Sequence, residues 1–212
     1  MADRVVIAQA GDEAARAALD RCIRGGGIAV FPADTLYGLA CDPCDAGAIE
    51  RIHALKGRDE AKPSAVMFFS PLAMRELVAA LGPRTRDALG ALLPGPVTLV
   101  VHNPERRYPL ACREDPERLG VRLIEGPLGG AGCAVFQTSA NRTGTPAPHR
   151  FEDVEPAIVE GVDLAIDGGE LRGAPTTVVD LTRIDSGGVW RVLRAGAMEE
   201  GEIERRLGAI RE

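Results

Sequence analysis

The sequence contains the segment Ile28-Ala29-Val30-Phe31-Pro32-Ala33-Asp34-Thr35-Leu36-Tyr37-Gly38-Leu39. Its first four residues are a short apolar run, which predicts a buried β-strand, and the proline ends that strand because it has no N–H to donate to a sheet. Carboxylate and hydroxyl side chains follow directly. Open α/β sheets bind ligands beyond the ends of their strands, so this segment predicts one wall of a binding site.

Strands and helices alternate on both sides of this segment. The expected strands are residues 4–8, 28–31, 65–69, 97–102, 120–124, 133–138, 164–166, 177–181 and 189–193. The expected helices are residues 12–24, 46–55, 70–81, 83–93, 154–160 and 199–207, with Asp12 and Asp45 as N-caps of the first two. Because strands alternate with helices early and cluster late, the pattern predicts one α/β domain over residues 1–212, with helices flanking a sheet of mixed strand direction.

The 212 residues are 45% hydrophobic and 26% charged, which is typical of a globular domain and excludes a disordered or coiled-coil chain. No apolar run approaches the roughly 20 residues that span a bilayer, and the N-terminus lacks the pattern of a signal peptide. Five cysteines are too few, and odd in number, for a disulfide scaffold. We therefore expect a cytoplasmic protein with no membrane partner.

The formal charge of −6 is unevenly distributed. Residues 151–170 contain seven acidic residues and no basic one, so the rest of the chain carries a net charge of +1. Only two of the 25 basic residues are lysines, Lys56 and Lys62, and they lie six positions apart. Lysine is a compact point charge whereas arginine is a planar fork, so this pair indicates a site that needs the former. The acidity excludes a generally basic coat but is compatible with a focused anion pocket.

Common catalytic motifs are missing, since the sequence has no P-loop, no G-x-G-x-x-G and no G-x-S-x-G. Residues 126–132 are glycine-rich without the required spacing, which predicts a flexible loop. Cys41 and Cys44 form a single C-x-x-C, whereas a zinc site would need a second pair. A thioredoxin-type motif is the alternative, because a helix is expected after Cys44. The three histidines lack metal-ligand spacing, so no metal-binding residue is expected.

Small polar and basic clusters recur at the ends of the expected strands. They occupy residues 32–39, 55–58, 62–63, 94–98, 121–122, 138–144, 174–177 and 193–196. Their basic residues are Lys56, Arg58, Lys62, Arg122, Arg142 and Arg194. Each cluster alone is typical of a capped turn or a solvated surface. Together, the clusters predict a pocket for a phosphorylated ligand at one end of the sheet.

In this order the clusters resemble the YrdC family, the threonylcarbamoyl-adenylate synthases of tRNA modification, over roughly residues 25–197. The matching motifs are P-x-[ED]-T-x-Y-G-L (32–39), K-x-R (56–58), P-G-P-x-T (94–98), S-x-N (139–141), T-V-V-D (177–180) and R-x-G (194–196). The chain ends soon after the last motif and so resembles the short, single-domain form. The resemblance implies a YrdC-like twisted, mixed sheet with a concave, electropositive cavity.

The resemblance also implies a nucleotidyltransferase reaction, in which L-threonine, bicarbonate and ATP, with Mg²⁺, give L-threonylcarbamoyl-AMP and pyrophosphate. A downstream tRNA threonylcarbamoyl-transferase complex would then modify adenosine 37 of tRNA. A carbamate oxygen attacks the α-phosphate in line, so the protein needs no covalent nucleophile. Catalysis would come from positioning the substrates and neutralising the charge of the triphosphate.

The resemblance divides the expected site residues into two groups. The ATP-binding group is Lys56, Arg58, Lys62, Thr98, Ser139, Asn141 and Arg194, with Lys56 and Arg58 as the catalytic residues. The threonine-binding group is Thr35, Tyr37, Arg122 and Thr176, with Arg122 pairing with the carboxylate. Asp34 is expected to shape the threonine pocket, and Asp180 is expected to hold a turn.

The departures from the family pattern lie mainly on the amino-acid side. Ala33 stands where threonine is usual, and Met67 stands where a histidine associated with the threonine site is common. The family's R-x-P has Ile124 in place of proline, the segment 123–138 is short, and Thr176 replaces a serine. ATP binding is therefore more strongly indicated than threonine specificity.

Two other functions remain open on the sequence. One is a non-catalytic RNA- or ribosome-binding relative that uses the concave surface for tRNA or double-stranded RNA, although aromatic residues, at 4%, offer little base stacking. The other is an adenylate-forming carbamoylation enzyme with a different acceptor, as in larger proteins that carry a YrdC-like domain. Pyrophosphate release that requires both threonine and bicarbonate separates these functions.

Overall fold

The computed structural model describes residues 2–57 and 63–208, within which ten strands form one sheet in the order β1-β8-β2-β3-β7-β4-β6-β5-β9-β10. The strands are β1 (Asp3–Val6), β2 (Ala29–Pro32), β3 (Tyr37–Cys41), β4 (Ala65–Phe68), β5 (Val97–His102), β6 (Arg118–Leu123), β7 (Ala134–Ser139), β8 (Leu164–Asp167), β9 (Thr177–Asp180) and β10 (Arg191–Arg194). The helices are α1 (Ile7–Ala10), α2 (Asp12–Arg24), α3 (Ala46–Lys56), α4 (Pro71–Ala79), α5 (Pro83–Leu92), α6 (Pro109–Cys112), α7 (Pro156–Gly161) and α8 (Glu200–Gly208).

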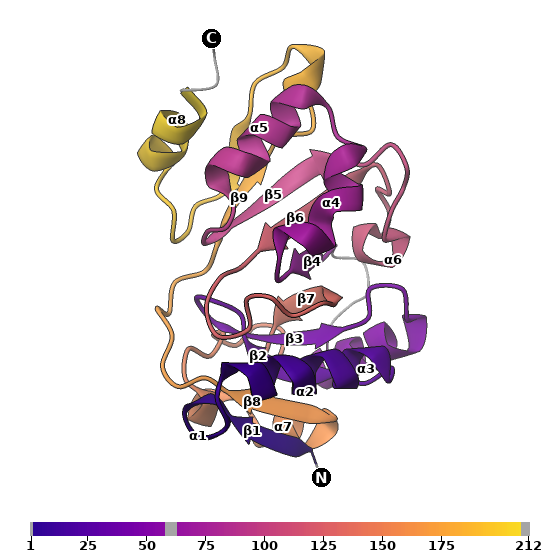
Figure 1. Ribbon diagram of the computed structural model, residues 1–212, viewed down its shortest axis with the longest axis vertical. Helices are drawn as coiled ribbons and strands as arrows, with labels where there is room; N and C mark the ends of the chain where they lie inside the picture. The colour runs from indigo at the N-terminus through magenta and orange to yellow at the C-terminus, as the bar shows by residue number, and fades with distance from the viewer. Residues whose placement is uncertain (1, 58–62, 209–212) are drawn as a thin grey trace.

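The sheet is mixed and twisted, as the sequence predicts. Strand β8 runs parallel to β1 and β2, β4 to β6, and β5 to β9, whereas the remaining neighbours are antiparallel. Figure 1 shows the strands stacked from β1, near the N-terminus, to β5 and β9, nearer the C-terminus. The predicted α/β class with a mixed sheet is therefore confirmed.

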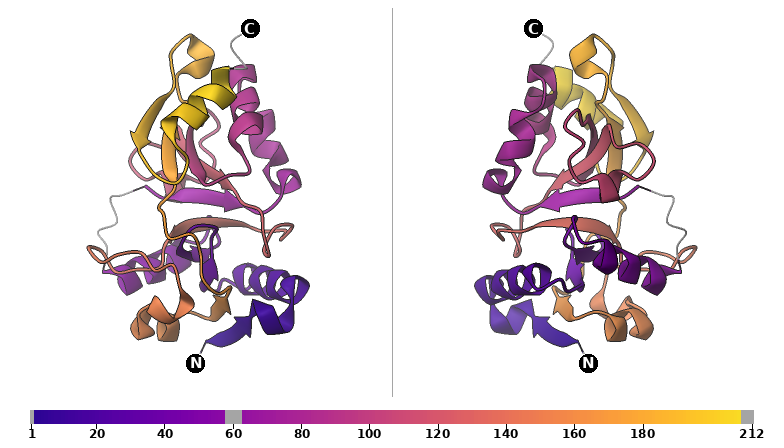
Figure 2. Two further views of the ribbon diagram at one scale, coloured as in Figure 1. Left: turned by 90° about the vertical axis from the view of Figure 1, so that its left-hand side faces the viewer. Right: turned by 90° about the vertical axis from the view of Figure 1, so that its right-hand side faces the viewer.

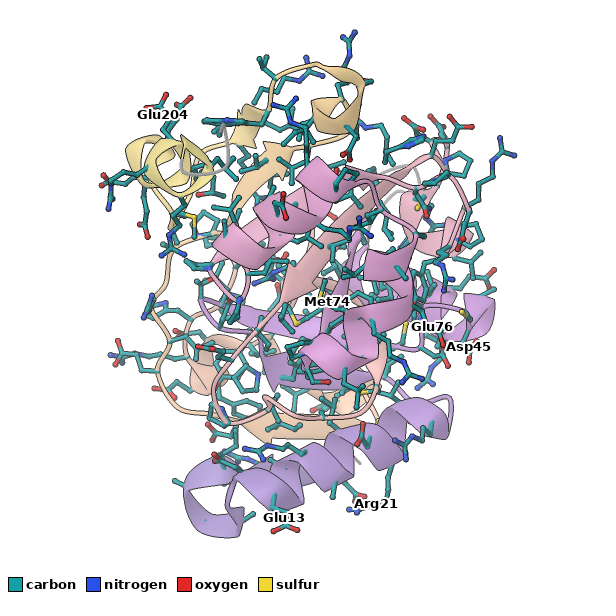
Figure 3. All side chains as sticks on the ribbon, turned by 45° about the horizontal axis from the view of Figure 1, so that its top comes forward. Glu13, Arg21, Asp45, Met74, Glu76 and Glu204 are labelled. Atoms are coloured by element: carbon teal, nitrogen blue, oxygen red, sulfur yellow. The ribbon has the colours of Figure 1, made fainter. Side chains whose placement is uncertain are left out.

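Helices cover the two faces of the sheet unequally. The apolar side chains of α3, α4, α5, α7 and α8 pack in one cluster against one face. Helix α2 packs against the other face, over the β2 and β8 end, and lies across the lower strands from α3 (Figure 2). Figure 3 shows Glu13 and Arg21 projecting outward from α2, which leaves its apolar side for the sheet. The rest of this second face carries the cavity described below.

Helix α3 follows the sequence prediction closely. Asp45 accepts a hydrogen bond from the Ala48 N–H as N-cap, and Gly57 ends the helix with a φ of 56°, a conformation that glycine adopts at little cost. Ile49 and Ile52 are buried against the sheet. These ends fix the length of the helix, and its last residue, Lys56, therefore falls beside the end of β7.

Strands β2 and β3 form a hairpin whose turn, residues 33–36, contains the polar residues that follow the apolar run 28–31. The Ala33 N–H donates to the Leu36 carbonyl across the turn. The Tyr37 hydroxyl donates to the Gly169 carbonyl at 2.8 Å and accepts from the Gly168 N–H at 3.0 Å, which ties the hairpin to the chain after β8. Burial raises the pKa of Tyr37 to about 12. The neutral phenol of Tyr37 thus anchors the hairpin to the Gly168–Gly169 turn.

The structure corrects several predicted elements. The first strand stops at Val6 because its only partner, β8, ends opposite it, and Ile7–Ala10 turn into α1. Asp12 is not the N-cap of α2, since Gly11 holds that position. Strand β3 and helix α6 were not predicted. Strand β3 is buried on both faces, so its sequence does not alternate, and unlike the run 28–31 it contains a glycine and no β-branched residue that would indicate a buried strand.

The glycine-rich segment 126–132 is a loop, as predicted, but it is anchored to α2. Asp20 accepts hydrogen bonds from the N–H groups of Gly132 and Cys133, and Arg16 donates to the Pro127 carbonyl at 2.8 Å. Leu128, within the loop, is buried. The C-x-x-C holds two free thiols, Cys41 buried and Cys44 exposed. Across the described ranges, no helix combines the length and the apolar character needed to cross a bilayer.

The substitution Tyr37→Phe tests the anchoring of the hairpin. It removes a hydroxyl that satisfies one backbone donor and one acceptor, so we expect a loss of about 1–3 kcal/mol in the free energy of unfolding, measured by urea denaturation. Tyr108→Phe is the matched control, because the Tyr108 hydroxyl makes no such bridge within the described chain. Equal stability of the two variants would contradict this role for Tyr37.

Candidate functional site

A cavity of about 650 Å³ lies on the sheet face that α2 leaves uncovered. Two small residues on neighbouring strands, Ala65 on β4 and Gly120 on β6, line it from the same face of the sheet. Small residues at these positions leave the sheet surface hollow. The predicted site residues that line the cavity are Thr35, Tyr37, Thr98, Arg122, Ser139, Thr176 and Arg194. The structure therefore brings all four residues of the predicted threonine group, and three of the seven residues of the predicted ATP group, to one pocket.

Arg122 is the most deeply buried charge of the cavity, with only 5% of its side chain exposed. Its Nη2 donates to Asp34 Oδ1 at 2.6 Å and its Nη1 donates to Gln137 Oε1 at 3.0 Å, whereas its buried Nε has no partner within the described chain. A guanidinium stays charged in a protein, so its burial requires such partners. The arrangement holds Arg122 with part of its donor capacity unused.

Asp34 reaches Arg122 from a costly backbone conformation. Its φ of 145° is rare for a residue with a side chain. The same carboxylate oxygen also accepts the Thr35 N–H at 2.7 Å. Such strain persists only where the surrounding structure enforces it, and it concentrates at functional sites. The β2–β3 turn thus directs this carboxylate at Arg122.

Arg194 enters the cavity from the edge strand β10. Its Nη2 donates to the Thr176 carbonyl at 2.8 Å and to Thr176 Oγ1 at 3.2 Å, and the hydroxyls of Thr98 and Thr176 lie 3.2 Å apart. Burial, followed by the nearby charge of Arg122, lowers the pKa of Arg194. Within the described chain no carboxylate pairs with Arg194. This end of the cavity therefore has an excess of positive charge.

Lys56 is buried at the end of α3 and reaches the turn after β7. Its ammonium donates to the carbonyls of Ser139 and Asn141, the latter at 2.7 Å, and lies 3.5 Å from Ser139 Oγ. The Thr143 N–H donates back to the Lys56 carbonyl at 2.9 Å. Lys56 thus fixes the path of the chain where Ser139 enters the cavity.

Three predicted residues lie differently from their expected roles, and two fall outside the described residues. Lys56 is not among the described residues that line the cavity, because its ammonium points to the backbone after β7. Asn141 borders a neighbouring cavity of about 360 Å³, and its Nδ2 donates to the carbonyls of Arg142 and Thr145. The Tyr37 hydroxyl is committed to the Gly168–Gly169 turn, so Tyr37 contributes to the pocket by positioning the hairpin. Arg58 and Lys62 lie outside the described residues.

Gln137 and Arg118 are cavity residues that the sequence reasoning missed. Gln137 lies two positions before Ser139, and Arg118 lies four before Arg122, so strand alternation places each on the face of its predicted neighbour. Arg118 donates to Asp180 Oδ2 at 3.0 Å. Extending the period-2 pattern backward from the predicted residues would have found both.

Asp180 holds a turn, as predicted. Its Oδ1 accepts from the Thr182 N–H and hydroxyl, and its Oδ2 accepts from Arg118 and Arg191. Burial alone would raise the pKa of Asp180, but the hydrogen bonds from Thr182 and the two arginines lower it. This carboxylate therefore stays ionised and fixes one side of Arg118.

The described lining of the cavity supplies cationic side chains and hydrogen-bonding groups. Among the described residues, no group of three or more His, Cys, Asp or Glu side chains is placed to hold a metal ion. Met67, which faces Arg122 across β4 and β6, is fully buried in the apolar cluster beneath α2. The cavity can bind an anionic ligand and orient its reacting groups.

Comparison with known proteins agrees with this geometry. The family model of Sua5, YciO and YrdC proteins, described as "Telomere recombination", matches residues 21–196. A protein named threonylcarbamoyl-AMP synthase from Chromohalobacter salexigens is 36% identical over 166 residues, which cover 75% of this chain and 88% of that protein.

Two solved structures share the fold. The structure of P. abyssi Sua5 complexed with L-threonine has a TM-score of 0.81 at 26% identity, covering 98% of this chain and 61% of that one. The structure of E. coli YciO has a TM-score of 0.78 at 24% identity, covering 96% of this chain and 100% of that one. This chain thus spans about three fifths of the P. abyssi protein. Because the family model matches most of its length, the chain belongs to the Sua5/YciO/YrdC family.

Proposed function

We propose that this protein is an L-threonylcarbamoyladenylate synthase, which condenses L-threonine, bicarbonate and ATP to threonylcarbamoyl-AMP and pyrophosphate. The observation that carries the proposal is the convergence of two arginines in one cavity: Arg122 pairs with Asp34, whereas no carboxylate of the described chain pairs with Arg194. The name of the C. salexigens relative and the L-threonine complex of P. abyssi Sua5 support the same substrates.

The reaction requires that the protein position the substrates and neutralise the negative charge of the phosphates. The amine of threonine and bicarbonate give a carbamate and water, and a carbamate oxygen then forms a bond to the α-phosphorus of ATP. The bond between that phosphorus and the α,β-bridging oxygen breaks, and the β- and γ-phosphates leave together as pyrophosphate. Cationic side chains and hydrogen-bond donors around the phosphates stabilise this transfer without a covalent enzyme intermediate.

We assign the phosphate side to the residues near the turn after β7 and to β10. Lys56 holds the carbonyls of Ser139 and Asn141, which positions the Ser139 hydroxyl at the cavity wall and adds a positive charge there. Arg194 supplies a second cation, with Thr98 beside it. Arg58 and Lys62 complete this group in the proposal. The catalytic residues are Lys56 and Arg58.

We assign the threonine side to the region around Arg122. Arg122 pairs with the carboxylate of the amino acid, while Thr35 and Thr176 offer hydroxyls at the cavity wall. Asp34 holds Arg122 in place, and Tyr37 positions the hairpin that carries Asp34. The two arginines lie close enough for the charge of Arg122 to lower the pKa of Arg194, so the amino acid and the phosphates would meet between them.

In the proposed reaction, Mg²⁺ binds together with ATP. Mg²⁺ prefers phosphate oxygens and water, and binds to proteins through few carboxylates, so we place it on the phosphates of ATP, where it would neutralise charge. The product would pass to a tRNA threonylcarbamoyl-transferase complex in the cytoplasm for N6-threonylcarbamoyladenosine formation at position 37, with tRNA or double-stranded RNA as a further partner.

The proposal is tested directly by a pyrophosphate-release assay with purified protein. We expect release from MgATP that requires both L-threonine and bicarbonate, because the carbamate is the attacking group. The omission of either one should reduce the rate to background. Turnover of ATP that is indifferent to threonine would exclude this substrate, and turnover with another amine would favour a different acceptor.

The substitutions Lys56→Ala and Lys56→Met should reduce the rate of pyrophosphate release at least about 100-fold, because they remove a positioned charge from the phosphate side. The methionine variant keeps most of the apolar stem, and thermal unfolding of both variants separates loss of the fold from loss of catalysis. A non-catalytic RNA-binding protein would instead show no wild-type release, steep salt dependence of RNA affinity, and only a modest effect of either substitution.

The substitution Arg194→Gln should weaken ATP binding about tenfold or more at low salt, measured by equilibrium titration, since it removes a cation that no carboxylate neutralises. Added salt should shrink the difference from wild type. Arg191→Gln is the matched control, on the same strand but paired with Asp180 and 65% exposed. Equal loss in both variants would contradict a specific role for Arg194.

A further inference from the structure

Gln137 lines the cavity beside Arg122 and belongs to none of the motifs that carry the family resemblance. We propose that Gln137 determines recognition of the substrate carboxylate: its carboxamide oxygen orients Arg122, and its amide nitrogen donates to the carboxylate that Arg122 binds. The inference rests on the proposed function, because it concerns the amino-acid end of the same pocket.

The register of β7 brings Gln137 beside Arg122. Gln137 pairs with Ala40 on β3 and with Ala65 on β4, and Ala65 in turn pairs with Gly120 on β6. Paired residues share a face of the sheet, and these neighbours are small. The long side chain of Gln137 therefore has room to cross toward β6, where its Oε1 meets Arg122 Nη1 at 3.0 Å.

The chemistry of the contact fixes which way the carboxamide points. A guanidinium has donors and no acceptor, so the atom of Gln137 that faces Arg122 must be the oxygen. The nitrogen then points to the opposite side, above Gly38. A Cβ at Gly38 would lie 3.0 Å from Gln137 Nε2 and 3.0 Å from Phe31 Cε1. Glycine at this position thus leaves space for the amide group.

The amide nitrogen is available to a ligand. Gln137 lines the cavity and is half-buried, and within residues 2–57 and 63–208 its Nε2 makes no hydrogen bond. Arg122 has five N–H donors, of which the bonds to Asp34 and Gln137 use two. A carboxylate that binds beside this pair, without displacing their mutual hydrogen bond, would accept from Gln137 Nε2 and from an unused N–H of Arg122.

A neutral partner at this position preserves the positive charge of Arg122. Asp34 already offsets part of that charge, and Met67 on the adjacent strand provides no polar group. A second carboxylate in place of Gln137 would neutralise the guanidinium and repel an anionic substrate. Gln137 instead adds a donor without adding negative charge. Sites that hydrogen-bond a substrate group discriminate strongly against ligands that lack it.

The test pairs Gln137→Leu, which keeps the volume, with a ligand that lacks the carboxylate. Affinities for L-threonine, L-threoninamide and ATP are measured by equilibrium titration on wild type and variant. We expect the variant to bind L-threonine about tenfold or more weakly, since it loses hydrogen bonds to a charged group, whereas its affinity for L-threoninamide and ATP stays within about twofold. Gln9→Leu, at the exposed second glutamine in α1, is the matched control and should match wild type.

A second substitution at the same position tests the effect of a negative charge on L-threonine binding. Gln137→Glu should weaken L-threonine binding more than Gln137→Leu does, because it adds a repelling charge as well as removing a donor. Unchanged L-threonine affinity in Gln137→Leu, or equal weakening for L-threonine and L-threoninamide, would overturn the proposal. A wild-type protein that binds ATP but not L-threonine would overturn the proposed substrate, and the role of Gln137 with it.

Discussion

The ion pair between Arg122 and Asp34 constrains the architecture of the cavity more than any other contact. Burying a guanidinium is costly unless a counter-charge and further hydrogen bonds accompany it, and breaking such a pair leaves an uncompensated charge. Arg122 is on β6, in the middle of the sheet, whereas Asp34 is in the β2–β3 turn. The pair thus joins segments that are distant in both the sequence and the strand order.

Much of the surrounding structure serves to hold Asp34 where that pair requires it. The turn adopts a φ of 145° at Asp34, which costs free energy unless its surroundings enforce it. Two contacts of Tyr37 hold the turn in this conformation. The Tyr37 hydroxyl bridges Gly168 and Gly169, and the Tyr37 N–H donates to the Pro148 carbonyl. The phenol is buried and neutral, so it satisfies backbone groups without adding a charge that would compete for Arg122.

The sequence predicts those parts of this arrangement that depend on local chemistry. The N-cap at Asp45 and the glycine at position 57 define α3, and so they place Lys56 at the end of the helix. Motif residues such as Arg122, Thr176 and Arg194 could be nominated because they follow or end apolar runs. Strand β3 could not be predicted, because it neither alternates nor contains the β-branched residues that reveal the equally buried β2. The role of Gln137 depends on cross-strand register, and that of Tyr37 on a contact with a turn about 130 residues away, and a single sequence shows neither.

The placement of the ion pairs explains how a chain with a net negative charge can hold a positively charged pocket. Five of the seven acidic residues between 151 and 170 pair with arginines, among them Asp163 with Arg51, Glu155 with Arg142 and Glu170 with Arg150. None of the acidic residues in this segment lines the 650 Å³ cavity. Exposed charges farther apart than about 8 Å are largely screened at physiological ionic strength, so these pairs contribute little field inside the pocket. Inside the pocket Arg118 pairs with Asp115 and Asp180, and Arg122 pairs with Asp34, whereas Arg194 has no carboxylate partner within the described chain. The unpaired charge of Arg194 is what the proposed anionic substrate would neutralise.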